Sequence, residues 1–440
     1  WNEADEVDLE FHVRHIALPQ PGDWRQLMIQ IARLHARPLD RSRPLWEAYV
    51  IEGLDHIPDL PRGSFAIFTK MHHAAVDGIA AIDVMRRLHD GQHEPTGSLT
   101  ESAANDATAS EGELVARAVV HALERVGRTS LTSLNGAARA TGILLDQLAQ
   151  KLNPAIHGDG KGAQAPGFAR APTTRFNHPI SANRAIEAVG LPLDGIKRIR
   201  SLVPGATIND VFLAVCGGAL RRYLASKSEL PERSLVALMP ISVRAEGAGG
   251  DGGNQVGGVA VPLCTDVADP VDRLRAVKRE AAQSKQQADV VGRDLPMTIV
   301  ESVPHFIADV VVRNALFRQL NTTVSNVRGP ETALTFAGAR LMRLYPISMV
   351  ADNVGHNHTG VSYDGTLWIS VVACRNMLPD PAFYAQCLRN SYDELLMRAD
   401  AAVVRDTAAP TSIAAARKAG DSAAKHGRAR TARVRVARPA

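Results

Sequence analysis

The stretch Met71-His72-His73-Ala74-Ala75-Val76-Asp77-Gly78 decides how the rest of the chain is interpreted. An apolar, β-favouring run at residues 64–70 precedes it, and apolar residues at helical spacing follow it. This pattern predicts a strand, a short loop and a helix, with His73 at the strand end and Asp77 at the helix start. An imidazole at a strand end can point into a cleft and act as a base near neutral pH.

Three simpler interpretations of this stretch compete with a catalytic base. A histidine in a half-buried strand is often only a satisfied core or edge residue. Neighbouring strand residues point to opposite faces, so His72 and His73 cannot hold one metal ion together, and no third His or Cys lies at ligand spacing. A phosphate loop needs more glycine than Gly78 provides. We therefore predict no metal site, and the structural histidine stays open as the alternative.

Length and composition are those of a folded, two-domain protein. The chain has 440 residues, 45% hydrophobic and 22% charged, enough for two domains that each bury a core. No apolar run is long enough to span a membrane, and no signal peptide opens the chain. The cysteines are scattered without CxxC spacing, which predicts buried thiols in a reducing, cytoplasmic compartment. They are Cys216, Cys264, Cys374 and Cys387.

The two ends of the chain differ from its body. Residues 7–15 alternate like a strand already under way, and we expect a further N-terminal segment before Trp1 in the natural protein. Residues 406–440 carry eight Lys or Arg against two Asp, while the whole chain has a net charge of +4. This tail has no apolar period, so we expect it to be disordered. It could touch anionic lipid or nucleic acid, but a solvated tail is simpler, and we expect no specific nucleic-acid partner.

The first half contains recognisable elements around the central stretch. Asp23 is a suitable N-cap for a helix with one apolar face, and a strand is expected at 46–51 after Pro44-Leu45-Trp46. The simplest role of that tripeptide is a turn whose Trp fills the core. Residues 92–112 resemble a linker. Helical patterns at 113–152 could dock on a membrane but more simply pack on the protein, and Gly- and Pro-rich residues 153–172 form the crossing between domains.

The second half alternates strands and helices. Strands are expected at 185–190, 235–241, 257–263, 321–330 and in a hairpin joining 356–363 to 367–372, and helices at 194–203, 208–219, 270–287 and 380–399. The glycine-rich residues 247–258 fit a mobile loop. His356 and His358 share one strand face, which we predict to be polar, and Asn357 points to the other face.

The start of the helix at 208–219 contains one residue that local structure does not explain. Thr207 and Asp210 form a capping box, so Asp210 needs no chemical role. Asn209 remains unexplained by capping. In the first turn its amide can donate a hydrogen bond to developing negative charge, which the helix dipole also favours.

Four stretches together resemble the bacterial wax ester synthase/acyl-CoA:diacylglycerol acyltransferase family, especially mycobacterial triacylglycerol synthases. They are His72–Gly78 (HHxxxDG), Pro44-Leu45-Trp46 (PLW), Asn209-Asp210 (ND) and Ser325-Asn326 followed by Val-Arg-Gly-Pro. Gly253-Asn254 and the stretch from Asn357 to Tyr363 also fit. HHxxxDG alone occurs in other acyltransferases, whereas its combination with PLW and ND in this order is specific. The resemblance covers Trp1 to about Val404.

The resemblance implies an α/β fold of the two-domain CoA-dependent acyltransferase (chloramphenicol acetyltransferase-like) type, with the active site between the domains. Residues 1–152 would form the first domain, 153–172 a linker, 173–405 the second domain and 406–440 a tail. The implied reaction moves a long-chain acyl group from acyl-CoA, the co-substrate, to diacylglycerol or a long-chain alcohol. No cofactor is implied. With no transmembrane segment, contact with the inner membrane or lipid inclusions would be peripheral.

The same resemblance assigns residues to roles. His73 would be the general base, and a thioester, being already activated, needs neither metal nor covalent intermediate. Asn209 would stabilise the oxyanion, with Ser325 or Asn326 behind it. Asp77 would hold the loop through an arginine, and His72 and Gly78 would shape it. The expected substrate-binding residues are Pro44, Leu45, Trp46, Asp210, Ser325, Asn326 and Asn357.

Two rival functions remain open. A condensation-type domain shares HHxxxDG but joins carrier-bound substrates, and PLW, ND and the lack of a carrier-like segment argue against it. A catalytically silent homologue could instead bind a lipid surface or nucleic acid through its basic tail. Such binding would be salt-sensitive and indifferent to His73.

Overall fold

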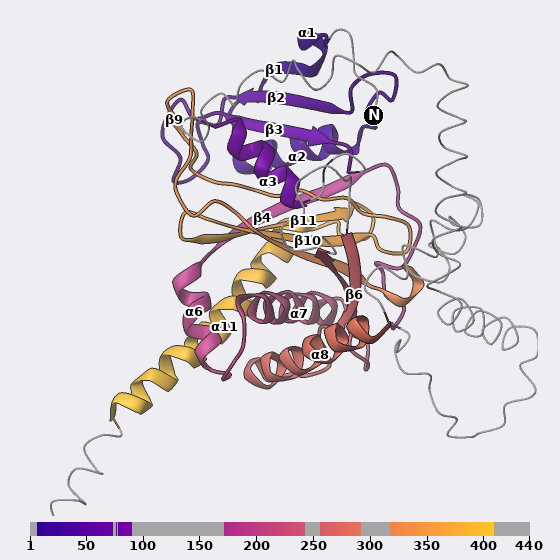
Figure 1. Cartoon of the computed structure of the whole chain (residues 1–440), viewed down its shortest axis with the longest axis vertical. Helices are drawn as coiled ribbons and strands as arrows, with labels where there is room; N and C mark the ends of the chain where they lie inside the picture. The colour runs from indigo at the N-terminus through magenta and orange to yellow at the C-terminus, as the bar shows by residue number, and fades with distance from the viewer. Residues whose placement is uncertain are drawn as a thin grey trace, which may run out of the picture.

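The computed structural model describes residues 7–89 without 74, 75 and 77, then 171–242, 256–291 and 317–408. Figure 1 shows these residues stacked in layers: a small sheet at the top, two helices, a larger sheet, and a layer of helices below. Within the described ranges, no helix is long and apolar enough to cross a membrane. The predicted linker at 92–112 and the helices at 113–152 lie outside the described residues, as do residues 153–170 of the crossing, 247–255 of the glycine-rich loop and 409–440 of the basic tail. Residues 406–408, predicted to be disordered with the tail, instead form the end of helix α11 (Pro381–Ala408).

The small sheet has three strands in the order β1-β2-β3. Strand β1 (Val13–Ala17) runs parallel to β2 (Trp46–Glu52), and β2 runs antiparallel to β3 (Ala66–Met71). The predicted strand over residues 7–15 is wrong in its first half, because Leu9–His12 form the short helix α1. Asp8 caps this helix by accepting a hydrogen bond from the backbone N–H of Phe11, and such a cap favours a helical turn over extended chain.

Helix α2 (Trp24–Ala36) lies between the two sheets (Figure 1). It begins, as predicted, at Asp23, which forms a capping box with Gln26. Its buried apolar face shares one hydrophobic cluster with the small sheet and with Ile186 and Val372 of the larger sheet. Because α2 packs against both sheets, the two sheets share one hydrophobic core.

The larger sheet has six strands in the order β4-β11-β10-β7-β5-β6. The strands are β4 (Arg184–Pro192), β5 (Val236–Ser242), β6 (Val256–Pro262), β7 (Thr322–Arg328), β10 (His356–Tyr363) and β11 (Thr366–Cys374). Strand β10 pairs antiparallel with β11 and parallel with β7. The strands and the hairpin predicted from the second half of the sequence are confirmed.

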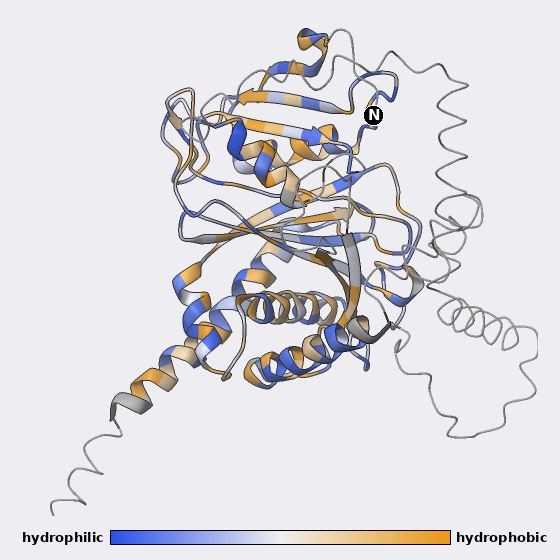
Figure 2. Cartoon of the chain, viewed as in Figure 1, coloured by the Kyte–Doolittle hydropathy of each residue, from blue (hydrophilic) through white to orange (hydrophobic). Residues whose placement is uncertain are grey.

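Four helices cover the face of this sheet that points away from the small sheet (Figure 1). They are α6 (Leu193–Ser201), α7 (Ile208–Ser226), α8 (Pro270–Val291) and α11 (Pro381–Ala408). Figure 2 shows mixed hydrophobic and hydrophilic residues along these helices, as expected when one side of each faces the core. The remaining elements are α3 (Gly78–Arg87), η2 (Phe317–Gln319), β8 (Thr335–Phe336) and β9 (Ala339–Arg340).

The predicted polar strand face formed by His356 and His358 is in fact part of the core. Both side chains are 0% exposed beneath the helical layer. The Nε2 atom of His358 lies 2.7 Å from the hydroxyl of Tyr384 in α11, and Nδ1 of His356 lies 2.9 Å from Oγ1 of Thr322. The alternation of faces was predicted correctly, but α11 packs over the face that carries the histidines.

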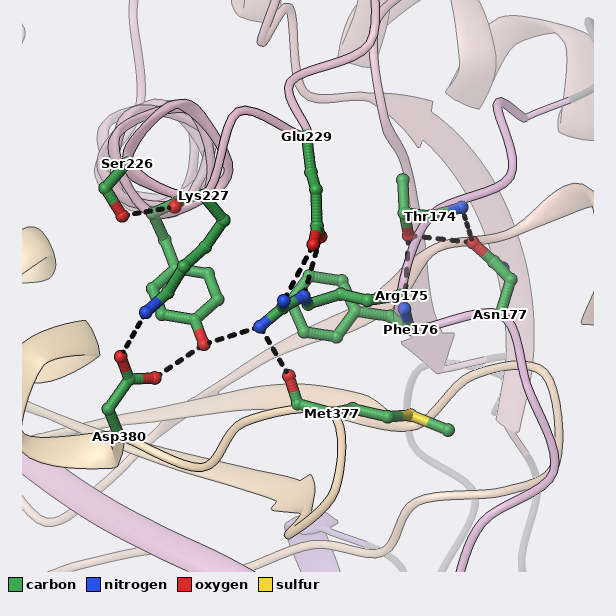
Figure 3. Close-up of polar contacts among 10 residues, drawn as sticks. Thr174, Arg175, Phe176, Asn177, Ser226, Lys227, Glu229, Met377 and Asp380 are labelled. Carbon is green, nitrogen blue, oxygen red and sulfur yellow. Dashed lines mark hydrogen bonds and ion pairs between the residues drawn. The ribbon is translucent and has the colours of Figure 1, made fainter.

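The chain enters the second sheet through an anchor drawn in Figure 3. Arg175 donates two hydrogen bonds to the carboxylate of Glu229, at 2.7 and 2.8 Å, and one to the hydroxyl of Tyr223. That hydroxyl donates to Asp380, which also accepts from Lys227. The anchor thus ties the chain after residue 170 to the end of α7 and the start of α11.

Candidate active site

The PLW and HHxxxDG stretches lie side by side because strands β2 and β3 pair. Trp46 stands opposite Met71 in this pairing. One residue further, the backbone N–H of His72 donates to the carbonyl oxygen of Leu45 at 3.0 Å. Two stretches that are 26 positions apart in sequence therefore form one edge of the small sheet, and the loop that carries His73 begins at this edge.

His73 is an exposed residue in the turn that follows β3. Its Nδ1 atom lies 2.9 Å from the carbonyl oxygen of Val76. A carbonyl oxygen can only accept, so Nδ1 must carry the proton and donate it. In the neutral ring, Nε2 then carries the lone pair, which is the form a general base requires. Asp77 lies outside the described residues, so its predicted role stays a prediction.

Trp46 is held by a histidine that the sequence did not single out. The ring of His12 stacks on Trp46 with centroids 4.6 Å apart, and Nδ1 of His12 donates to the carbonyl oxygen of Trp46 at 2.6 Å. His12 is 1% exposed and Trp46 is half-buried. Trp46 therefore starts a strand and packs on α1, as well as contributing apolar surface. Only the position of His12 within a short run of aromatic and basic residues could have drawn attention to it.

A charged group below the His73 loop fastens the end of β3 to α2. The ammonium of Lys70 donates to the carbonyl oxygens of Leu34, at 3.1 Å, and Arg37, which belong to the last turn of α2 and its cap. Burial lowers the pKa of Lys70. Beside it in the sheet stands Glu47, 8% exposed, which accepts from the hydroxyl of Tyr49 at 2.6 Å. These contacts fix the strand two residues before His72.

The start of α3 rests on the larger sheet. A Cβ atom built on Gly78 would lie 3.0 Å from Cγ2 of Val327 in β7, so glycine permits this close approach. Side chains alternate along β7, so Ser325 shares the face of Val327, while Asn326 points to the helical side. Ser325 is half-buried and Asn326 exposed. The structure thus brings the HHxxxDG stretch to the strand that carries Ser325.

Asn209 and Asp210 lie on the other side of that sheet, at the N-terminus of α7. The capping box is confirmed: Asp210 accepts from the N–H and hydroxyl of Thr207, both at 2.8 Å. The amide of Asn209 donates to the sulfur of Met239 at 3.3 Å. Because a thioether is a weak acceptor, this amide can exchange its partner for a stronger acceptor at little cost.

Asn357 contacts the protein itself. It is 3% exposed; its Nδ2 donates to the carbonyl oxygen of Met349 at 3.1 Å, and its Oδ1 accepts from Thr359. The residue before Met349 is Ser348, whose carbonyl oxygen accepts from Nε2 of His35 in α2 at 3.0 Å. Asn357 therefore positions the segment before β10, which contacts α2. A direct contact with substrate stays a prediction.

The described ranges contain no group of three or more His, Cys, Asp or Glu side chains that could hold a metal ion. The four cysteines are buried and unpaired, as predicted. Burial raises the pKa of Cys264 to about 12 and that of Cys387 to about 11. Neither thiol is therefore poised to act as a thiolate nucleophile.

Comparison with known proteins points to one family for both halves of the chain. Residues 1–212 match the model of the wax ester synthase/diacylglycerol acyltransferase catalytic domain, and residues 252–396 match the model of the C-terminal domain of the same family. The protein named "Putative diacyglycerol O-acyltransferase Rv3480c" from Mycobacterium tuberculosis is 36% identical over 407 residues, which is 86% of this chain and 79% of that protein.

Two further relatives agree with this result. The O-acyltransferase WSD of Acinetobacter baylyi is 33% identical over 386 residues, with the same coverage of 86% and 79%. The solved structure of the wax ester synthase/diacylglycerol acyltransferase from Marinobacter aquaeolei VT8 superposes with a TM-score of 0.62 at 25% identity. That match covers 91% of this chain and 83% of the other, so the mixed α/β architecture is shared.

Proposed function

Because the chain belongs to the wax ester synthase/diacylglycerol acyltransferase family, we propose that it transfers a long-chain acyl group from acyl-CoA to diacylglycerol, with a long-chain alcohol as a second acceptor. The observation that carries the proposal is the hydrogen bond from Nδ1 of His73 to the carbonyl oxygen of Val76. This bond fixes the tautomer in which Nε2 is the base.

The reaction follows from that tautomer. Nε2 of His73 removes the proton of the acceptor hydroxyl while its oxygen forms a bond to the thioester carbon. The carbonyl oxygen becomes negatively charged in the tetrahedral intermediate. The carbon–sulfur bond then breaks, and the imidazolium returns its proton to the departing sulfur. The products are an ester and free CoA, and His73 is neutral again.

The oxyanion of that intermediate requires a hydrogen-bond donor. Asn209 is our first candidate, because its amide, at the start of a helix, donates to a weak sulfur acceptor. Ser325 is the second, because it faces the same way as Val327, which contacts the HHxxxDG helix at Gly78. Asn326, which faces the helical side of β7 as Asn209 does, is the third candidate. Asp77 would hold the loop, as the sequence predicts.

The proposed acceptors also suggest where in the cell the reaction takes place. Both acceptors are poorly soluble in water and partition into lipid, so we propose that the protein works peripherally at the inner membrane or at lipid inclusions. We also place the boundaries between the two domains at residues 152 and 173. The positions of the small and the larger sheet, before residue 90 and after residue 170, support this division.

The test compares the unchanged protein with His73→Ala, using labelled palmitoyl-CoA and either diacylglycerol or hexadecanol. Loss of a general base should lower the rate roughly 10²- to 10⁴-fold. His56→Ala is a matched control, because Nδ1 of His56 also donates to a backbone carbonyl, that of Pro21, from an exposed turn. Its rate should stay unchanged.

Each other result has a definite meaning. Equal rates with and without His73 would remove it from the mechanism. Product formation only from a carrier-bound acyl group would favour a condensation-type enzyme. No product from the unchanged protein, together with lipid binding that needs residues 406–440, would favour the catalytically silent homologue.

A further inference from the structure

Three hydroxyl side chains lie in a row on the face of the larger sheet that points toward the small sheet. Ser325 of β7 stands beside Thr359 of β10, and Thr359 stands beside Ser370 of β11. Paired residues of neighbouring strands share a face, and strands are about 4.8 Å apart. The row therefore extends about 10 Å from β7 into the sheet, and we call it the hydroxyl row.

Ser370 is the inner end of the hydroxyl row. Its neighbours Ile369 and Val371 belong to the core under the helical layer, so Ser370 points the other way, toward the small sheet. It is 1% exposed, and its Oγ has no hydrogen-bond partner among the described residues. Buried hydroxyls nearly always have a partner, so this hydroxyl is available to a bound molecule.

The other two members line the sheet between Ser370 and the HHxxxDG helix. Thr359 donates its proton to Oδ1 of Asn357 at 2.8 Å, which fixes the orientation of its hydroxyl. Ser325 is half-buried and lies two residues before Val327, the contact of Gly78. The hydroxyl row thus begins beside the start of the HHxxxDG helix and ends at a buried donor.

The flanks of the hydroxyl row are largely apolar. The next level of the sheet holds Val361 and Trp368. The level on the other side holds Val372 and Ile186 together with Asn357, whose Oδ1 accepts from Thr359. No charged side chain occupies these positions. A strip of hydroxyls between uncharged and mostly apolar flanks fits an ester group with hydrocarbon chains on both sides, and it fits the phosphates of CoA poorly.

We propose that the hydroxyl row binds an ester carbonyl of the acceptor diacylglycerol, with Ser370 as the donor. This inference rests on the function proposed above and makes Ser370 a specificity residue. A diacylglycerol carries two ester carbonyls besides its reacting hydroxyl, whereas a fatty alcohol carries none. A donor that only one acceptor can use discriminates between them, and the protein then prefers diacylglycerol.

The experiment removes the hydroxyl with Ser370→Ala and measures kcat/KM for diacylglycerol and for hexadecanol with the same acyl-CoA. Loss of one neutral hydrogen bond should lower the value for diacylglycerol roughly three- to tenfold, mainly through KM, and leave that for hexadecanol unchanged. The melting temperature should not fall, because Ala replaces a hydroxyl that has no partner in the described part of the chain.

Ser391→Ala is the matched control. Ser391 is also buried with an unpartnered Oγ among the described residues, but it lies in α11 against Gly218, in the helical layer. It should leave the ratio of the two acceptors unchanged. An equal change of the ratio in both variants would overturn the inference, because it would then reflect packing.

Two further results would also overturn it. An unchanged ratio in Ser370→Ala is one. A higher KM for acyl-CoA with both acceptors is the other, because the row would then hold the donor substrate. Binding of dioctanoylglycerol, measured by calorimetry without acyl-CoA, separates this inference from the proposed function. A Kd three- to tenfold weaker in Ser370→Ala supports the hydroxyl row even if no turnover is found, and an equal Kd contradicts it.

Discussion

The buried histidines should make the fold sensitive to acid well above the range in which most carboxylates titrate. Burial lowers the pKa of His358 to about 3. Burial, followed by the nearby charge of Arg184, lowers the pKa of His35 to about 4. Burial lowers the pKa of His356 as well, with a smaller contribution from His358. His358 and His35 are therefore neutral in the folded protein at pH 5.

The unfolded chain, by contrast, takes up a proton on each histidine near pH 6.5. Because the folded state binds fewer protons below that pH, its stability is complete above pH 6.5 and is lost as the pH falls toward the folded pKa. Each histidine costs about 1.4 kcal/mol per pH unit, or about 2 kcal/mol at pH 5. For His35 and His358 together this is about 4 kcal/mol, a large part of a typical total of about 5–15 kcal/mol.

Equilibrium unfolding in urea between pH 7.5 and pH 5 measures this loss. The unchanged protein should lose stability steadily below pH 6.5. His358→Gln keeps a hydrogen-bonding group near Tyr384 but cannot be protonated, so its dependence on pH should be shallower by about 1.4 kcal/mol per unit. A free energy of unfolding that stays constant from pH 7 to pH 5 would refute the argument, as would identical slopes in the two proteins.

Three shorter predictions concern other parts of the structure. Arg175→Ala breaks the two hydrogen bonds to Glu229 and should lower the free energy of unfolding in urea by about 1–2 kcal/mol. Arg175→Lys keeps the charge but not the paired hydrogen bonds. If the two variants lose the same free energy of unfolding, the paired geometry is not important. In Gly195→Ala the new Cβ would lie 1.8 Å from the hydroxyl of Tyr392, so the melting temperature should fall by several degrees. Asn357→Ala removes the hydrogen bond to the carbonyl oxygen of Met349 and should loosen the segment before β10. It should lower kcat, while KM for acyl-CoA changes less; a change confined to KM would instead indicate a substrate contact.

The sequence was sufficient for most features that depend on neighbours in the chain. The N-cap at Asp23 and the capping box at Thr207 were predicted because their partners lie within three residues. The strand and helix around His72 were predicted from apolar spacing. The short helix at residues 9–12 was not, because four residues are too few to show a helical period, and a local cap at Asp8 determined the outcome.

Features that depend on pairing between distant strands could not be predicted in this way. The alternation of His356 and Asn357 was clear, but only the packing of α11 shows that the face of His356 is buried. The hydroxyl row exists because Ser325, Thr359 and Ser370 fall into register, and register is invisible in a single strand. His12 supports Trp46 across 34 positions, and no local pattern links the two residues.

The position of α2 between the sheets constrains how the chain can reach its native state. The buried face of this helix is completed by Ile186 and Val372, which are synthesised much later, and the indole of Trp24 donates to Glu187, 163 positions away. During synthesis the first sheet would therefore expose an apolar helix until β4 and β11 have formed. Long-range contacts of this kind slow folding and leave intermediates prone to aggregation. We expect production of the first sheet alone to give insoluble material, and production of the longer chain to benefit from chaperones.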